Sequence, residues 1–155
     1  MNDLVICDAL IVDGSGREPA TGDVAVLGGV ISAVGKHGLT GTQLVDGSGL
    51  VLAPGIVDIH THYDAQLTWD ASASPSPQMG VTTVVVGNCG FGLAPCHPDH
   101  RDLTLKNLTK VEGMPLDALL NGVLWEFETF TDYLDMLVAR GVVLNVAALA
   151  NHSCI

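Results

Sequence analysis

The chain has few basic residues. Its 155 residues include six Lys and Arg against 17 Asp and Glu, which gives a net charge of −11 with neutral His. Nucleic acids and anionic membrane surfaces attract clusters of Lys and Arg. We therefore expect neither nucleic acid nor a membrane surface as a partner. The sequence also lacks an uninterrupted apolar run long enough for a transmembrane helix, so we predict none.

Two further absences concern the cellular compartment. Residues 1–6 contain no basic segment ahead of an apolar one, so they do not resemble a signal peptide. The cysteines show no closely spaced pair; they are Cys7, Cys89, Cys96 and Cys154. This usage is typical of reduced thiols and predicts a cytoplasmic protein. An apolar content of 48% with 15% charged residues predicts a folded core rather than a disordered chain.

Glycine-rich turns separate short apolar runs over residues 1–53. Residues 4–6 and 10–12 have the composition of strands, and Gly28-Gly29 joins two further apolar runs. Glycine reaches positive φ without strain, so the Gly-Gly pair favours a β-hairpin. We predict a small antiparallel β-module in this part of the chain.

The pattern changes after Pro54-Gly55. Apolar runs rich in Val and Ile predict strands, and stripes of apolar residues at helical spacing predict helices between the second and third strand. The expected strands are 56–60, 80–86 and 142–149, and the expected helices are 102–111, 115–120 and 129–140. This order predicts an α/β fold with parallel strands buried on both faces.

His60 and His62 end the first of these strands. Side chains two residues apart share a face of a strand, so both imidazoles, with Asp58, point the same way. Neutral imidazole nitrogens are good ligands for zinc. An H-x-H pair also occurs by chance, so two hydrogen-bonded surface histidines are the alternative.

Cys89 follows the second strand between two glycines. Counting by two from Val81 places it on one face at the carboxyl end of the strand, where active sites of α/β folds gather. A thiolate there can bind a divalent cation. The alternative is that Cys89 is a small buried apolar residue.

Other polar residues have simpler interpretations. The segment 96–100 (Cys-His-Pro-Asp-His) has the composition of a metal site, but a solvated loop is the better interpretation. His152 follows the third strand, and we interpret it as structural, although it could face a substrate. Among the acidic residues, Asp64 is the best candidate for a role because it lies close to His62 in sequence.

Several motifs resemble one family. Residues 54–64 (PGIVDIHTHYD) resemble the first barrel strand of the amidohydrolase superfamily, and residues 80–95 (GVTTVVVGNCGFGLAP) resemble the second strand of its N-acyl-D-amino-acid deacylase, or D-aminoacylase, branch. Similarity continues at 111–115 (VEGMP), 125–130 (WEFETF) and 145–149 (NVAAL). The Gly-Asn-Cys-Gly segment narrows the resemblance to this branch.

The resemblance implies a (β/α)8 TIM barrel flanked by a small β-sandwich, in which residues 1–53 form part of the sandwich and 54–155 the first three β/α units. It further implies a zinc-dependent hydrolase that cleaves N-acyl-D-amino acids into a carboxylate and a free D-amino acid. His60, His62 and Cys89 match metal ligands, with Cys89 in the place of a bridging carboxylated lysine. Two further histidines and the catalytic Asp are implied beyond the end of the chain.

The resemblance also leaves alternatives and one departure. Another amidohydrolase acting on cyclic amides is a second hypothesis, which the Gly-Asn-Cys-Gly segment disfavours. A third is an inactive truncated product, because a barrel needs about 250 residues. We expect an N-terminal fragment that is poorly soluble and inactive alone. Asn151 stands where the branch usually has a Gly before the histidine, which puts the role of that turn in doubt.

Overall fold

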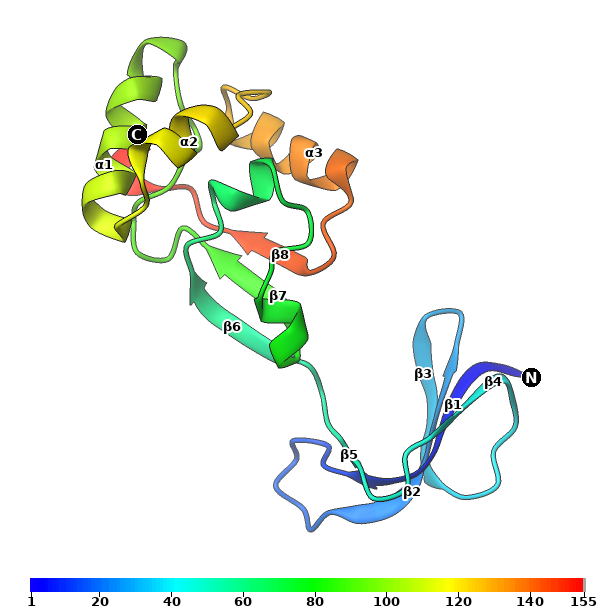
Figure 1. Cartoon of the computed structure of the whole chain (residues 1–155). Helices are drawn as coiled ribbons and strands as arrows, with labels where there is room; N and C mark the ends of the chain where they lie inside the picture. Colours follow the sequence, from blue (N-terminus) through cyan, green and yellow to red (C-terminus); the bar gives the residue numbers. More distant parts are fainter. Residues whose placement is uncertain (155) are drawn as a thin grey trace. The chain divides into compact units, whose positions relative to one another are not determined.

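The computed structural model describes residues 1–154 and contains two compact units, Met1–Pro54 and Gly55–Ile155 (Figure 1). Ile155, the last residue of the second expected domain, lies outside the described residues. Within residues 1–154, no helix combines the length and the apolar character needed to cross a membrane.

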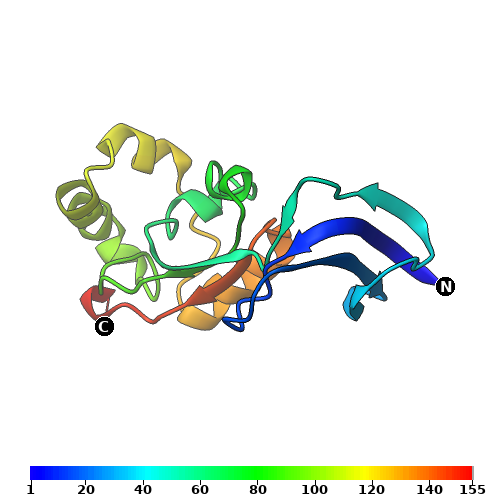
Figure 2. The same ribbon diagram turned by 90° about the horizontal axis from the view of Figure 1, so that it is seen from below.

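The first unit is a single sheet with β1 between β2 and β4 (Figures 1 and 2). Its strands are β1 (Asn2–Ile11), β2 (Ala20–Leu27), β3 (Val30–Lys36), β4 (Gly41–Asp46) and β5 (Val51–Leu52). The order is β3-β2-β1-β4, and the short β5 also pairs with β1. The expected hairpin joins β2 and β3, where Gly28 and Gly29 have φ of 59° and 77°.

The expectation of a purely antiparallel module is wrong. Strands β4 and β5 both run parallel to β1. After β3, which is one edge of the sheet, the chain crosses to the other side of β1. Turn residues reveal hairpins between sequence neighbours, but they carry no information on the direction of a strand that returns from a crossover.

The two apolar runs expected at 4–6 and 10–12 belong to one strand. The register with β2 shifts between Ile6 and Ala9, and Asp8 in between has a φ of 53°. An irregularity of this kind re-aims side chains without ending the strand. Polar residues in the middle of β1 therefore mark a bulge rather than a turn.

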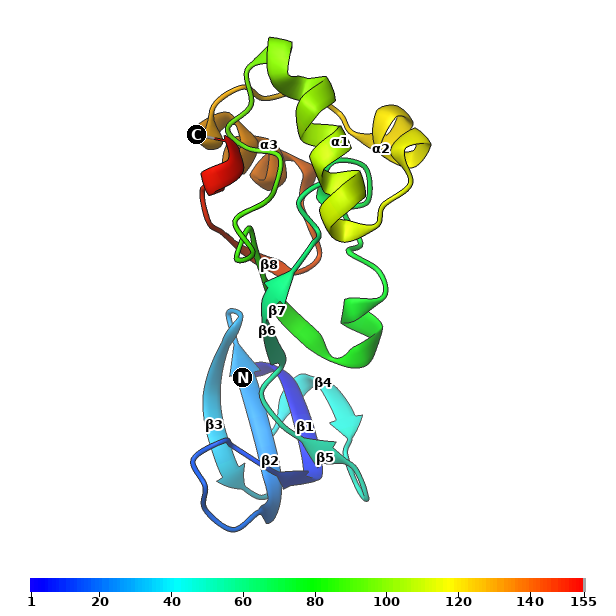
Figure 3. The same cartoon turned by 90° about the vertical axis from the view of Figure 1, so that its left-hand side faces the viewer.

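The second unit contains a parallel sheet in the order β6-β7-β8, as expected. Its regular elements are β6 (Ile56–Thr61), β7 (Val81–Val86), α1 (Arg101–Glu112), α2 (Leu116–Gly122), α3 (Phe130–Arg140) and β8 (Asn145–Ala148). Short 3-10 turns lie at Gln66–Thr68, Ser76–Met79, Pro98–His100 and His152–Cys154. Figures 1 and 3 show α1 and α2 near the carboxyl ends of β6 and β7.

The core of this unit forms between β7 and the apolar faces of the helices. Strand β7 contributes the buried residues Val84 and Val86, and α1 contributes Leu105 and Leu108. Helix α3 buries Tyr133, Met136 and Leu137. The expected helix start and end of α3 are confirmed: Thr129 and Asp132 form a capping box, and Gly141 is left-handed with a φ of 66°.

The prediction that all three strands are buried on both faces is wrong. The central β7 is largely buried, but Ile56, Val57 and Ile59 of β6 are 55%, 56% and 67% exposed. The third strand is also shorter than 142–149, because the N–H of Val143 donates to Ala71 outside the sheet. The composition of a segment shows that it is apolar, but it does not show whether other elements cover both faces of the strand.

Candidate metal centre

Strand β6 positions the two histidines at its carboxyl end. Thr61, between them, is buried, and its Oγ1 donates a hydrogen bond to the carbonyl of Val85 at 3.0 Å. This bond turns Thr61 toward β7, so the alternation of the strand turns both histidines to the other face. The ring centroids of His60 and His62 are 5.3 Å apart.

Cys89 reaches the same place through a tight turn rather than through strand alternation. Strand β7 ends at Val86, and Gly87 has a φ of 81°. The N–H of Gly90 then donates to the carbonyl of Gly87 at 3.0 Å. The positive φ breaks the period of two, so the expected count of alternating residues from Val81 to Cys89 is wrong.

Two contacts hold this turn against its surroundings. Asn88 Nδ2 donates to the carbonyl of Ile59 at 2.8 Å, which ties the turn to β6. The Sγ of Cys89 accepts the N–H of Phe91 and lies equally close, at 3.4 Å, to the Phe91 carbonyl. The thiol is half-buried, so it is both oriented and accessible.

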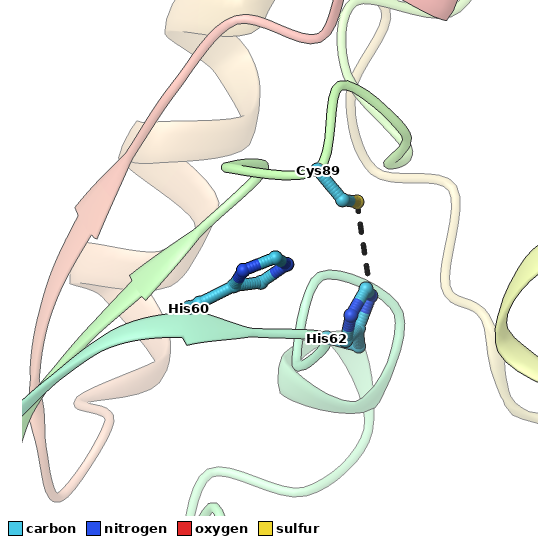
Figure 4. A group of neighbouring side chains, drawn as sticks. All are labelled: His60, His62 and Cys89. Carbon is cyan, nitrogen blue, oxygen red and sulfur yellow. Dashed lines mark hydrogen bonds between the residues drawn. The ribbon is translucent and has the colours of Figure 1, made fainter.

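The three side chains meet at one point (Figure 4). One potential ligand atom from each of His60, His62 and Cys89 lies within 4.8 Å of the other two. The Sγ of Cys89 is 3.8 Å from Nδ1 of His62. Imidazole nitrogen and thiolate sulfur are the ligands that zinc favours, and an ion about 2.0–2.3 Å from each donor fits between atoms at this separation.

A buried carboxylate lies directly behind His62. Glu112, the last residue of α1, has a side chain that is only 2% exposed, and its Oε1 is 2.8 Å from Nδ1 of His62. Burial raises the pKa of Glu112, and the hydrogen bond with His62 opposes that rise. Its second oxygen, Oε2, is buried without a hydrogen-bond partner among residues 1–154.

Asp64 is a second buried acid next to the site, as the sequence suggested. Burial is the main reason that its pKa rises to about 7, and the negative charge of Glu112 adds to the effect. The Oδ2 of Asp64 also has no hydrogen-bond partner within the described residues. The carbonyl of Asp64 accepts a hydrogen bond from the hydroxyl of the buried Tyr133 at 2.9 Å, which anchors this loop to α3.

Asn151 has a clear structural role, which the sequence left in doubt. It is 2% exposed, and its amide nitrogen, in the orientation that satisfies the surrounding carbonyls, donates to Phe91 at 2.9 Å and Gly87 at 3.2 Å. A Cβ at Gly92 would lie 2.5 Å from Oδ1 of Asp64, so only glycine fits this approach. Asn151 therefore supports the turn that carries Cys89.

The remaining candidates do not join the site. Cys96 is buried with its Sγ 3.4 Å from Oγ1 of Thr104, and His97 accepts the N–H of Asp99. His152 is exposed in the turn at His152–Cys154. Neither the 96–100 segment nor His152 lies in a ligand cluster of the described residues that includes His60, His62 and Cys89.

A second group of possible ligands lies in the first unit, and hydrogen bonds already use its buried member. Asp8, Asp23 and His37 have potential ligand atoms within 4.8 Å of one another. Both carboxylate oxygens of the buried Asp23 accept backbone N–H groups at 3.0 Å, from Asp8 and Leu39. These bonds lower the pKa of Asp23, and the bond from Asp8 holds the bulge of β1 in place.

Sequence reasoning missed Glu112 and left the role of Asn151 open. The predicted helix stopped one residue short of Glu112, and an acidic residue at a helix end is normally solvated. The signal was present in the segment 111–115, which resembles the family and places an acid before Gly113, the left-handed residue that ends α1. No local pattern distinguishes the buried Asn151 from an exposed one.

Comparisons with known proteins agree with this geometry. A model of the amidohydrolase family matches residues 43–153. Two proteins of Alcaligenes xylosoxydans xylosoxydans are similar over 97% of the chain: an N-acyl-D-aspartate deacylase, 38% identical, and a D-aminoacylase, 40% identical. The chain spans 28% and 29% of their respective lengths.

Solved structures give the same result. The α/β fold matches a D-aminoacylase crystal structure with a TM-score of 0.80 and 34% identity, covering 99% of this chain and 30% of that one. An N-acyl-D-glutamate deacylase of Bordetella bronchiseptica matches with a TM-score of 0.71, 31% identity and the same coverage. The fold, the motifs and the matched span agree, and the chain belongs to the amidohydrolase family.

Proposed function

We propose that the protein to which this chain belongs is a zinc-dependent hydrolase of the amide bond in N-acyl-D-amino acids. The products are a carboxylate and a free D-amino acid. The observation that carries the proposal is the meeting of His60, His62 and Cys89 at the carboxyl ends of two adjacent parallel strands. In α/β folds this edge of the sheet is where substrates bind.

The donor set suits zinc. Two imidazoles and one thiolate supply nitrogen and sulfur ligands, and fewer than four protein ligands leave a position for water or substrate. When bound, zinc acts as a Lewis acid that polarises a carbonyl oxygen and lowers the pKa of water to about 7. The carboxyl groups of Glu112 and Asp64, whose pKa values burial raises, ionise more readily when a divalent cation binds nearby, so they are compatible with a metal at this place.

Relatives support the metal and the substrate class. One solved D-aminoacylase is described by the role of its binuclear metal centre, and the N-acyl-D-glutamate deacylase was solved with zinc and a phosphonate that mimics the tetrahedral intermediate of the reaction. We extend both properties to this chain. The residues for substrate recognition and proton transfer, including a catalytic Asp, are assigned to the part of the relatives' length that this chain does not span.

The finer architecture is part of the same proposal. We assign Gly55–Ile155 to the first three units of a (β/α)8 barrel and Met1–Pro54 to part of a small flanking β-sandwich. The supporting observations are the parallel order β6-β7-β8 and the structural match to D-aminoacylase. A complete barrel needs about 250 residues, and the chain spans 28% and 29% of the length of the two Alcaligenes relatives.

The test compares zinc content and hydrolysis of N-acetyl-D-amino acids in a polypeptide that supplies the rest of the relatives' length. We expect Cys89→Ala to lose zinc and at least tenfold in kcat/KM, while Cys7→Ala, a cysteine of β1, keeps both. The N-acetyl-L-amino acids serve as the substrate control. Unchanged zinc content and rate in Cys89→Ala would remove the proposal.

A further inference from the structure

The segment after β8, residues 149–154, closes over the turn that carries Cys89, residues 86–92. We call the first the exit segment and the second the Cys89 turn. Backbone N–H groups of the exit segment donate to carbonyls of the Cys89 turn: Leu149 to Val86 at 3.0 Å and Ser153 to Gly90 at 3.1 Å. The position of the Cys89 turn therefore depends on a segment about 60 residues later in the chain.

Asn151 adds a side-chain contact at the centre of this closure. The residue is 2% exposed, and its amide donates to the carbonyls of Phe91 at 2.9 Å and Gly87 at 3.2 Å. The N–H of Phe91 in turn contacts the Sγ of Cys89 at 3.4 Å. One residue, Phe91, thus joins the amide of Asn151 to the sulfur of Cys89.

Glycines in the Cys89 turn permit this close approach. A Cβ at Gly87 would lie 2.5 Å from the carbonyl oxygen of Leu149, and one at Gly92 would overlap the side chain of Asn151. Such close approach of two backbones requires a residue without a Cβ. The turn therefore has no room to shift toward the exit segment, and the hydrogen bonds oppose movement away from it.

We propose that Asn151 is a positioning residue of the metal centre: by holding two carbonyls of the Cys89 turn, it directs the Sγ of Cys89 toward the two histidines. The inference rests on the proposed function, which gives the sulfur a cation to share with them. Groups that orient metal ligands without touching the metal commonly set its affinity.

The role concerns the sulfur more than the histidines. His60 and His62 are oriented by strand β6, in which the hydroxyl of Thr61 donates to the carbonyl of Val85 at 3.0 Å. Cys89 lies beyond the end of β7, on a turn, and its side chain points from that turn toward His62 (Figure 4). Loss of the Asn151 amide should therefore displace the sulfur while the histidine pair stays in place.

The experiment follows Cys89 itself. A thiolate that binds zinc is no longer free to react with iodoacetamide, because the metal and the reagent compete for the same sulfur. Peptide mass spectrometry then reports the alkylation of each cysteine separately, at low protein concentration and well below the melting temperature. In the wild-type chain we expect zinc to protect Cys89 and to leave Cys7, a residue of β1, unprotected.

Asn151→Leu keeps the branched shape of the side chain but removes the donors. We expect a lower melting temperature, because two carbonyls lose their partner, and a rise of about 10–100-fold in the zinc concentration that half-protects Cys89. A role limited to stability would lower the melting temperature without changing zinc protection in the folded chain. Asn145→Leu is the matched control, because Asn145 donates to Thr82 at the other end of the same two strands. It should be protected as the wild type is.

The outcomes separate the positioning role from the metal centre. If zinc protects Cys89 equally well in the wild type and in folded Asn151→Leu, the positioning role is wrong while the proposed metal centre stands. If the leucine variant does not fold, Asn151→Gly, which removes the amide without adding an apolar group, takes its place, and wild-type protection there has the same meaning. If zinc does not protect Cys89 in the wild type, the metal centre is wrong, and the positioning role is wrong with it.

Discussion

At the scale of the residue, the site depends on groups that support its candidate ligands. The turn that carries Cys89 is held by Asn151 and Asn88, and the loop after His62 is held by Tyr133. None of these supporting side chains belongs to the H-x-H pair or to the cysteine. Polar contacts made by residues outside the candidate ligand set therefore help to bring the ligands together.

The hydroxyl of Tyr133 provides a direct test of this support. It is buried and donates to the carbonyl of Asp64, so Tyr133→Phe leaves that carbonyl without its partner. We expect a loss of about 1–2 kcal/mol in the free energy of unfolding, measured by urea denaturation. Tyr63→Phe is the control, because its hydroxyl bonds to Ser76 in a half-buried position and should cost less. Equal losses would contradict the account.

At the scale of the element, α3 begins with a capping box. Thr129 Oγ1 accepts the N–H of Asp132 at 3.1 Å, and the carboxylate of Asp132 accepts the N–H of Thr129 at 2.9 Å. The helix then buries Tyr133 and two apolar residues in the core. Loss of the cap would therefore also affect the site, because Tyr133 of this helix holds the loop that contains Asp64.

Removal of the cap should cost measurable stability. Thr129→Ala deletes the hydroxyl that satisfies a free N–H in the first turn, and we expect a loss of about 1 kcal/mol in the free energy of unfolding. Thr131→Ala, an exposed threonine two residues further along the same helix, is the matched control and should be neutral or slightly stabilising. The same loss in both variants would show that helix propensity, rather than capping, is responsible.

The capping box also predicts a dependence on pH. Hydrogen bonds from the backbone and side chain of Thr129 lower the pKa of Asp132. A carboxyl group with a lowered pKa in the folded state stabilises that state above its ordinary pKa of about 3.9, and this contribution disappears as the pH falls through the folded-state value. We expect the difference in melting temperature between wild type and Asp132→Asn to be largest near neutral pH and to shrink in acid. A difference that grows in acid would contradict this assignment.

Local patterns predicted the elements better than their assembly. The helices, the Gly28-Gly29 hairpin and the parallel order of the second unit follow from periodicity, caps and turn residues. The direction of β4 and the exposure of β6 depend on which segments lie side by side, which no local pattern encodes. The histidine pair followed from strand alternation, whereas Cys89 depends on the positive φ of Gly87 and Glu112 on packing of α1.

At the scale of the whole molecule, both units expose apolar sheet surface. In the described part of the chain, β6 and β8 each pair only with β7, and the outer residues of β6 are more than half exposed. In the first unit, apolar residues of the sheet line a cavity of about 310 Å³, among them Ile6, Ile11 and Val34. Unpaired strand edges and apolar faces of this kind favour contact with further polypeptide.

This predicts that the 155-residue chain associates with itself. We expect sedimentation velocity to show a concentration-dependent increase in mass and no turnover of N-acetyl-D-amino acids by the chain alone. Val57→Lys places a charge on the exposed edge strand β6 and should shift the distribution toward monomer. Leu103→Lys, an exposed apolar position on α1, is the control and should have little effect. A monomeric wild type with measurable turnover would overturn the prediction.

The central claim is that Cys89 and the two histidines bind one divalent cation together, and cobalt substitution tests it most directly. A cobalt ion bound by thiolate gives a charge-transfer absorption that nitrogen ligands alone do not. We predict this band at one cobalt per chain, its loss in Cys89→Ser and its retention in Cys7→Ser. A wild-type spectrum without the band, or one that survives Cys89→Ser, would contradict the account.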